Sequence, residues 1–148
     1  MPASSLARIT KRGSLMAIHS RVSTYAICRL SIAFIWCYHG IVPKLLGPHA
    51  DELIMNMSLG LSAGQAVVLA KVAGLVEVFI GLSVLVFWRR RWPLYTTVFA
   101  MLALLVFVVL VTPAMLTGAF NPVSTNLGMI ALAVVALRQL EAEDSNSK

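Results

Sequence analysis

The feature that most constrains the fold is a set of four long apolar runs. Each is close to the ~20 residues that a helix needs to cross the hydrocarbon core of a bilayer. Inside lipid, every backbone amide must find a partner within its own segment, so helices are the economical solution. The chain is therefore predicted to be all-α, an integral membrane four-helix bundle with spans at 23–42, 64–88, 93–112 and 122–140.

The composition agrees with a membrane solvent. Of the 148 residues, 59% are hydrophobic and only 12% are charged, about half the charged fraction of a soluble domain. The net charge of +6 does not indicate nucleic acid, because the basic residues lie between the apolar runs and form no polar face. Membrane lipid is the expected partner. No catalytic motif, CxxC or metal-ligand pattern is found, and Cys28 and Cys37 would point to opposite sides of one helix.

The charges of the loops predict an orientation. The segment before the first span carries four basic residues and no acid, and Arg89, Arg90 and Arg91 link the second and third spans. The positive-inside rule therefore predicts that both termini are cytoplasmic, in an inner (plasma) membrane. The expected divisions are a basic, disordered arm at 1–20, a transmembrane domain at 21–140 and a polar tail at 141–148. The arm also resembles a transit peptide, and translation from Met16 is an alternative. Between the first two spans, "PHADELIMNMSLG" predicts a short interfacial helix.

Three ionisable residues fall within the apolar spans, namely Arg29, Lys71 and Glu77. A charge inside the membrane costs at least ~2.5 kcal/mol on insertion scales, so each should have a partner or a purpose. Depth estimates along the two helices predict that Arg29 and Glu77 form a buried charge pair. Gly74 and Gly81 lie on the same face as Glu77, and such a stripe of small residues allows a second helix to approach closely.

Polar residues also gather in the predicted outer half of the bundle. Basic and amide donors beside an indole wall suit an apolar ligand with a polar head. The alternative is that these side chains are interfacial anchors that only mark where helices leave the membrane. The predicted ligand-binding residues are Trp36, His39, Lys44, Lys71, Asn121 and Asn126.

Three stretches, "YHGIVPKLL", "AGLVEVFIGL" and "FNPVSTNLGMIALA", resemble the DoxX-like family of small four-helix membrane proteins. The similarity in order and spacing runs from about residue 28 to 137. It implies a bacterial inner membrane, and some relatives look like quinone-linked subunits of sulfur or thiol redox systems. The residues that carry the resemblance are His39, Gly40, Pro43, Lys44, Gly74, Glu77, Gly81, Asn121, Pro122 and Asn126.

Three functions compete at this stage. The first is a quinone-associated membrane subunit of an oxidoreductase, which would need bound quinone or a redox partner protein because the chain has no redox motif. The second is a small oligomeric transporter or channel subunit, in which Glu77 would be a proton or cation station. The third is a non-catalytic membrane scaffold, which needs only close helix packing and a charge pair.

Overall fold

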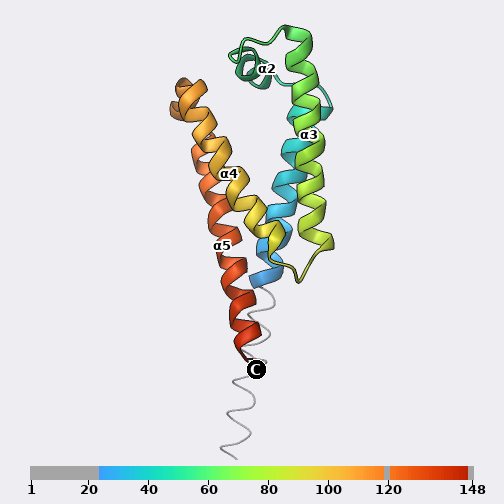
Figure 1. The fold of residues 1–148 in the computed structure, drawn as a ribbon, viewed down its shortest axis with the longest axis vertical. Helices are drawn as coiled ribbons and strands as arrows, with labels where there is room; N and C mark the ends of the chain where they lie inside the picture. Colours follow the sequence, from blue (N-terminus) through green and yellow to red (C-terminus); the bar gives the residue numbers. More distant parts are fainter. Residues whose placement is uncertain (1–23, 119–120, 147–148) are drawn as a thin grey trace, which may run out of the picture.

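The computed structural model describes residues 24–118 and 121–146, and the described residues are helical with no strand (Figure 1). Four helices are long and apolar enough to cross a membrane, as the sequence predicts. The arm at 1–20, including Met16, lies outside the described residues. The elements are the N-terminal helix (Thr24–Leu45, whose last five residues form the π-helical turn η1, Ile41–Leu45), α2 (Ala50–Met57), α3 (Ala63–Val86), α4 (Trp92–Val111), the 3₁₀ turn η2 (Pro113–Thr117) and α5 (Pro122–Asn146).

Local sequence signals explain where the helices begin. Ser62 and Gln65 form a capping box at the start of α3, so that two backbone donors without helical partners are satisfied. Helices α4 and α5 begin with a proline in their first turn, where a missing N–H costs nothing. Asn121 caps α5, since its Oδ1 accepts a hydrogen bond from the Ser124 backbone N–H at 3.1 Å.

The four long helices form two antiparallel pairs. The N-terminal helix packs along α3, and α4 packs along α5 (Figure 1). The two pairs meet in the lower part of Figure 1 and separate towards the upper end, where α2 lies. Because the pairs separate, the bundle is closed at one end and open at the other.

The closed lower part holds the core. Ile32, Trp36 and Leu94 are at most 2% exposed there, and the Trp36 indole N–H donates a hydrogen bond of 3.1 Å to Thr97 Oγ1 on α4. This bond connects the two helix pairs. Large apolar side chains on the outside remain exposed, such as Leu110 at 75%, which is the expected surface for contact with lipid chains.

Glycines set the separation of the N-terminal helix and α3. A Cβ added at Gly74 would lie 2.7 Å from the Gly40 carbonyl oxygen, and one added at Gly40 would lie 2.6 Å from the Gly74 carbonyl oxygen. A Cβ at Gly81 would lie 2.7 Å from Cys37 Sγ. The stripe of Gly74 and Gly81 therefore faces the N-terminal helix at backbone contact distance, and Gly40 is its counterpart on the other helix.

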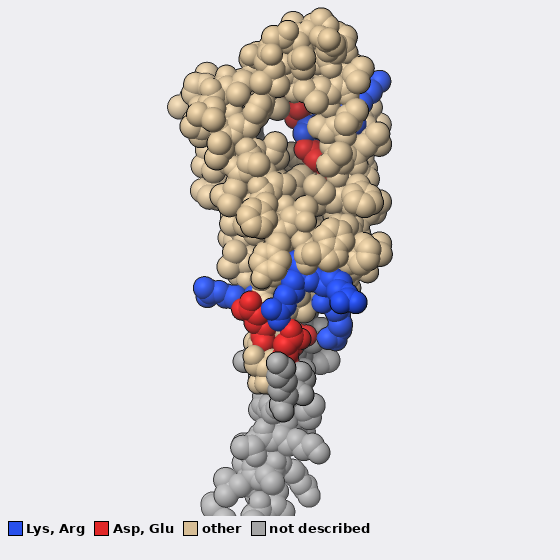
Figure 2. All heavy atoms as spheres, in the orientation of Figure 1, with Lys and Arg blue, Asp and Glu red and all other residues tan. Residues whose placement is uncertain are grey.

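The last helix is longer than expected. The span predicted to end at 140 continues as α5 to Asn146, so most of the polar tail is helical. Its acidic residues contact the arginine turn between α3 and α4: Arg91 donates to Asp144, and Arg89 Nη1 lies 3.6 Å from Glu143 Oε2. Figure 2 shows these charges gathered at the lower end. Exposed pairs of this kind add little stability.

Candidate functional site

Three ionisable side chains from three different elements meet in the upper half of the molecule. Lys44 in η1 donates a hydrogen bond from Nζ to Glu77 Oε1 on α3, and Nζ lies 3.5 Å from Glu52 Oε1 on α2. The side chains of Lys44 and Glu77 are only 8% and 9% exposed, and that of Glu52 is 19% exposed. We call these three residues the ion cluster.

The π-helical turn places Lys44 in this cluster. Pro43 has no N–H to donate to the preceding turn, so the α-helical ladder is interrupted there. The chain continues as a wider turn, in which the Leu46 N–H donates to the Ile41 carbonyl at 2.9 Å. The first predicted span ends at residue 42, just before Pro43, whereas the helix runs to Leu45. Single π turns are frequent at functional sites, and this one holds the cluster's lysine.

The charges of the ion cluster do not balance. One ammonium faces two carboxylates, so the cluster carries one formal negative charge when all three groups are ionised. Glu77 Oε1 accepts from Lys44, but Glu77 Oε2 is buried and has no hydrogen-bond partner among the described residues. A buried carboxylate oxygen without a donor is costly, so this atom is the most unusual feature of the site.

Glu52 is affected by the same surroundings. Burial raises the pKa of the Glu52 carboxyl above its ordinary value, the nearby Lys44 ammonium opposes that rise, and the Glu77 carboxylate adds to it. His39 has the smallest influence on the pKa of Glu52, which it lowers. The His39 residue itself is exposed, and its ring packs against Tyr38.

Figure 2 shows a hollow in its upper half, beside which a basic side chain lies between acidic ones. The pairing of Lys44 with Glu52 and Glu77 has the same order of charges. The other atoms visible around this hollow belong to residues other than Lys, Arg, Asp and Glu. A group that entered the hollow would meet these charges at one position and other residue types elsewhere.

The predicted Arg29–Glu77 pair is wrong. Arg29 is fully buried and donates to the carbonyl oxygens of Val84 at 2.9 Å, Phe87 at 2.9 Å and Arg90 at 3.2 Å. It thus caps the C-terminal end of α3, where carbonyls lack helical partners. Arg29 lies level with Phe87. Phe87 follows Glu77 by ten residues, so Arg29 and Glu77 are roughly 15 Å apart along the helix axis. The guanidinium and the carboxylate are therefore too far apart to pair.

Two predicted ligand residues are part of the packing between helices. Trp36 donates to Thr97 within the core. Asn126 is buried, and its Nδ2 donates to the Met101 carbonyl of α4 at 3.4 Å. Both side chains donate hydrogen bonds that connect two helices, and the structure does not bring them to the ion cluster.

Two others also lie apart from the cluster. Asn121 is occupied as the cap of α5 and donates from Nδ2 to the Gly118 carbonyl at 3.2 Å. Lys71 is exposed and makes no ion pair within the described part of the chain. It lies six residues before Glu77, which places it about 120° away around an ideal helix. Of the six predicted ligand residues, the structure thus places only Lys44 in the ion cluster, where it meets Glu52 and Glu77.

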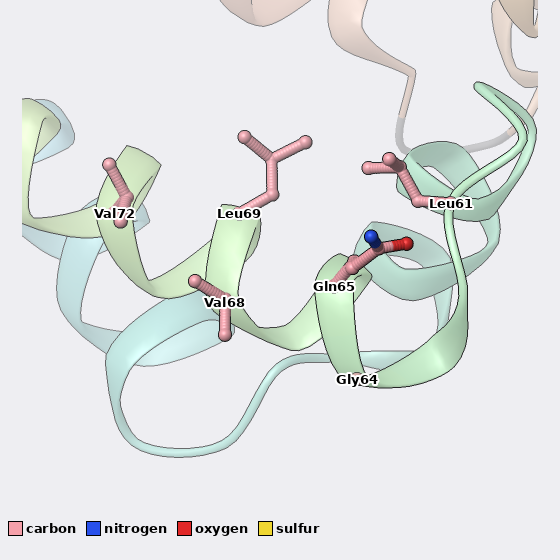
Figure 3. A pocket seen from close by; sticks show the side chains of 6 residues that line it. All are labelled: Leu61, Gly64, Gln65, Val68, Leu69 and Val72. Atoms are coloured by element: carbon pink, nitrogen blue, oxygen red, sulfur yellow. The ribbon is translucent and has the colours of Figure 1, made fainter.

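A groove of about 490 Å³ lies over the first turns of α3. Figure 3 shows its lining, in which Leu61 and Leu69 project from the same side of the chain and Gln65 lies between them. The lining has no charged residue, and none of its residues belongs to the ion cluster. This groove offers an apolar surface and lacks the charges that would fix a polar ligand.

Most of the chain matches a known protein family. The model of the DoxX-like family matches residues 33–134. The chain belongs to the DoxX-like family. With its four long apolar helices, this DoxX-like protein is a multi-pass integral membrane protein. No curated protein and no solved structure matches it. The matched region contains the whole ion cluster and both stripe glycines, whereas Arg29 lies before it.

Sequence reasoning missed Glu52 and gave Glu77 the wrong partner. Glu52 lies within the segment that predicts a short helix, and it occupies the first turn of α2. The glycines hold part of the signal, because Gly40 opposite Gly74 fixes the register of the two antiparallel helices. Lys44 and Glu77 lie within about one turn on either side of this contact. Which glycines meet is decided only in the tertiary structure.

Proposed function

We propose that this DoxX-like protein is an inner-membrane subunit of a redox system and binds a quinone head group beside the ion cluster. The observation that carries the proposal is the buried Lys44 ammonium, paired with two carboxylates. Figure 2 shows a hollow beside a basic side chain that lies between acidic ones. A quinone has a polar ring and an apolar tail, which suits such surroundings. The ammonium would favour the negative charge that a quinone oxygen gains on reduction.

In the proposed orientation, Lys44 and Glu52 belong to elements on the outer side, and Glu77 lies near the middle of α3. Arg89, Arg90 and Arg91 lie between α3 and α4, at the end opposite to the ion cluster. The positive-inside rule assigns that end to the cytoplasm. A redox partner protein would then reach the quinone from the outer face, and crosslinking in cells would identify such a partner or a homo-oligomer.

The test is retention of quinone by the purified full-length chain. Lipids that copurify with wild type, Lys44→Arg and Lys71→Arg are extracted and analysed by mass spectrometry. Lys44→Arg keeps the charge but replaces a compact ammonium with a planar fork, so we expect less quinone than in wild type. Lys71→Arg is the matched control, since Lys71 is exposed and outside the cluster. Wild type without quinone, or equal retention in Lys44→Arg, would contradict the proposal.

One observation favours a second candidate function, an oligomeric transporter subunit. Glu77 is a buried carboxylate within a spanning helix, and such groups serve as proton or cation stations in transporters. Proteoliposomes distinguish the candidates. Proton-coupled flux that is lost in Glu77→Gln would support a transporter, whereas quinone retention without flux supports the redox subunit.

A further inference from the structure

The hydrogen-bonding groups left over in the ion cluster indicate which form of the ligand the site prefers. A lysine ammonium has three N–H donors. One of those of Lys44 is donated to Glu77 Oε1, and Nζ lies 3.5 Å from Glu52 Oε1, so at least one N–H has no partner among the described residues. Glu77 Oε2 is a buried acceptor with no partner among the described residues. The cluster therefore holds one donor and one buried acceptor without partners.

A hydroxyl group complements this pair of free groups. Its O–H donates one hydrogen bond and its oxygen accepts another, so a hydroxyl can satisfy Glu77 Oε2 and the Lys44 N–H together. A quinone carbonyl only accepts, so it would use the lysine donor and leave the carboxylate oxygen buried without a partner. The single excess negative charge points the same way, since it favours a group that donates a proton in a hydrogen bond.

We propose that the ion cluster is a site for a phenolic hydroxyl, with Glu77 Oε2 as its acceptor, so that the protein binds the hydroquinone form of its ligand in preference to the quinone. This inference rests on the proposed function and names the redox state that the site selects. A hydrogen bond to a charged group is worth about 1.5 kcal/mol or more, and a quinone carbonyl cannot donate one to Glu77 Oε2. The expected preference is therefore at least about tenfold in dissociation constant.

The experiment compares three ligands on the detergent-solubilised full-length protein under anaerobic conditions. They are a decyl-substituted benzohydroquinone, the matching quinone and the dimethyl ether of the hydroquinone, which cannot donate. We expect the hydroquinone to bind at least about tenfold more tightly than the other two. Glu77→Gln should abolish this preference, whereas Asp51→Asn, a matched change at a 72% exposed carboxylate on α2, should keep it.

The outcomes separate the inference from the proposed function. If all three ligands bind equally, or if the quinone binds more tightly, the preference for a hydroxyl is overturned while quinone binding stands. If none of the three binds, both proposals are overturned. A preference that persists in Glu77→Gln would overturn the assignment of the acceptor. The comparison of ligands on wild type requires no variant, so it remains decisive even if Glu77→Gln does not fold.

Discussion

The pairing of Lys44 with Glu77 makes a quantitative prediction about stability. Both side chains are more than nine-tenths buried, so the pair belongs to the class in which removal of one partner leaves an uncompensated charge. Breaking such a pair costs ~3–5 kcal/mol. We expect Lys44→Met to lower the free energy of unfolding by about this amount, and Glu77→Gln to lower it by less, because Glu52 remains beside the ammonium. The double variant should lose less than the sum of the two single variants, because only Glu52 is then left without the ammonium.

The two single variants should differ in their response to pH. Lys44→Met leaves Glu77 and Glu52 without their cation, and a buried carboxylate in that position takes up a proton rather than remain charged. The cost of Lys44→Met should therefore shrink as the pH is lowered. Glu77→Gln leaves the ammonium beside Glu52 at 3.5 Å, so lowering the pH should not restore its stability.

The assay is a titration of the purified protein with sodium dodecyl sulfate in mixed micelles, followed by tryptophan fluorescence. The coupling energy is the difference between the double variant and the sum of the singles, and we expect about 1–3 kcal/mol. The control cycle uses Arg29→Lys with Glu77→Gln. Because these residues share no partner and lie roughly 15 Å apart along the axis, their effects should add within about 0.5 kcal/mol. Additive losses for Lys44 and Glu77, or coupling between Arg29 and Glu77, would refute the reasoning.

Three further predictions concern packing, pH and orientation. Gly74→Ala should lower the yield of folded protein measured by size-exclusion chromatography, because its Cβ would lie 2.7 Å from a backbone oxygen, whereas Gly64→Ala, with nothing within 4 Å, should not. Since burial raises the pKa of Glu52, the free energy of unfolding should fall as the pH rises through the folded-state pKa. In thermal unfolding, the melting temperature of Glu52→Gln should fall less over the same pH range. A cysteine at Gly118 should react with an impermeant thiol reagent added to whole cells and one at Arg90 should not, and the reverse pattern would invert the orientation.

The sequence alone determined the elements of this protein, for reasons that are local. The four spans follow from runs of apolar residues that only helices can carry through lipid. The capping of α5 by Asn121 and the short helix α2 follow from residues within a few positions of each helix start. The glycine stripe on α3 was also readable, because residues three and four apart share one face of a helix. In each of these cases the physical cause lies within one helix.

Only the tertiary structure decided which charges meet. Depths counted from the ends of each helix placed Arg29 near Glu77, but the contact between Gly40 and Gly74 sets the register between the helices, and Arg29 then reaches the end of α3. The π turn at Pro43 directs Lys44 towards Glu77, and Glu52 joins them because α2 folds back against α3. Long-range pairing of charges depends on register, turn geometry and the path of the connecting segment together, so no local pattern in the sequence specifies it.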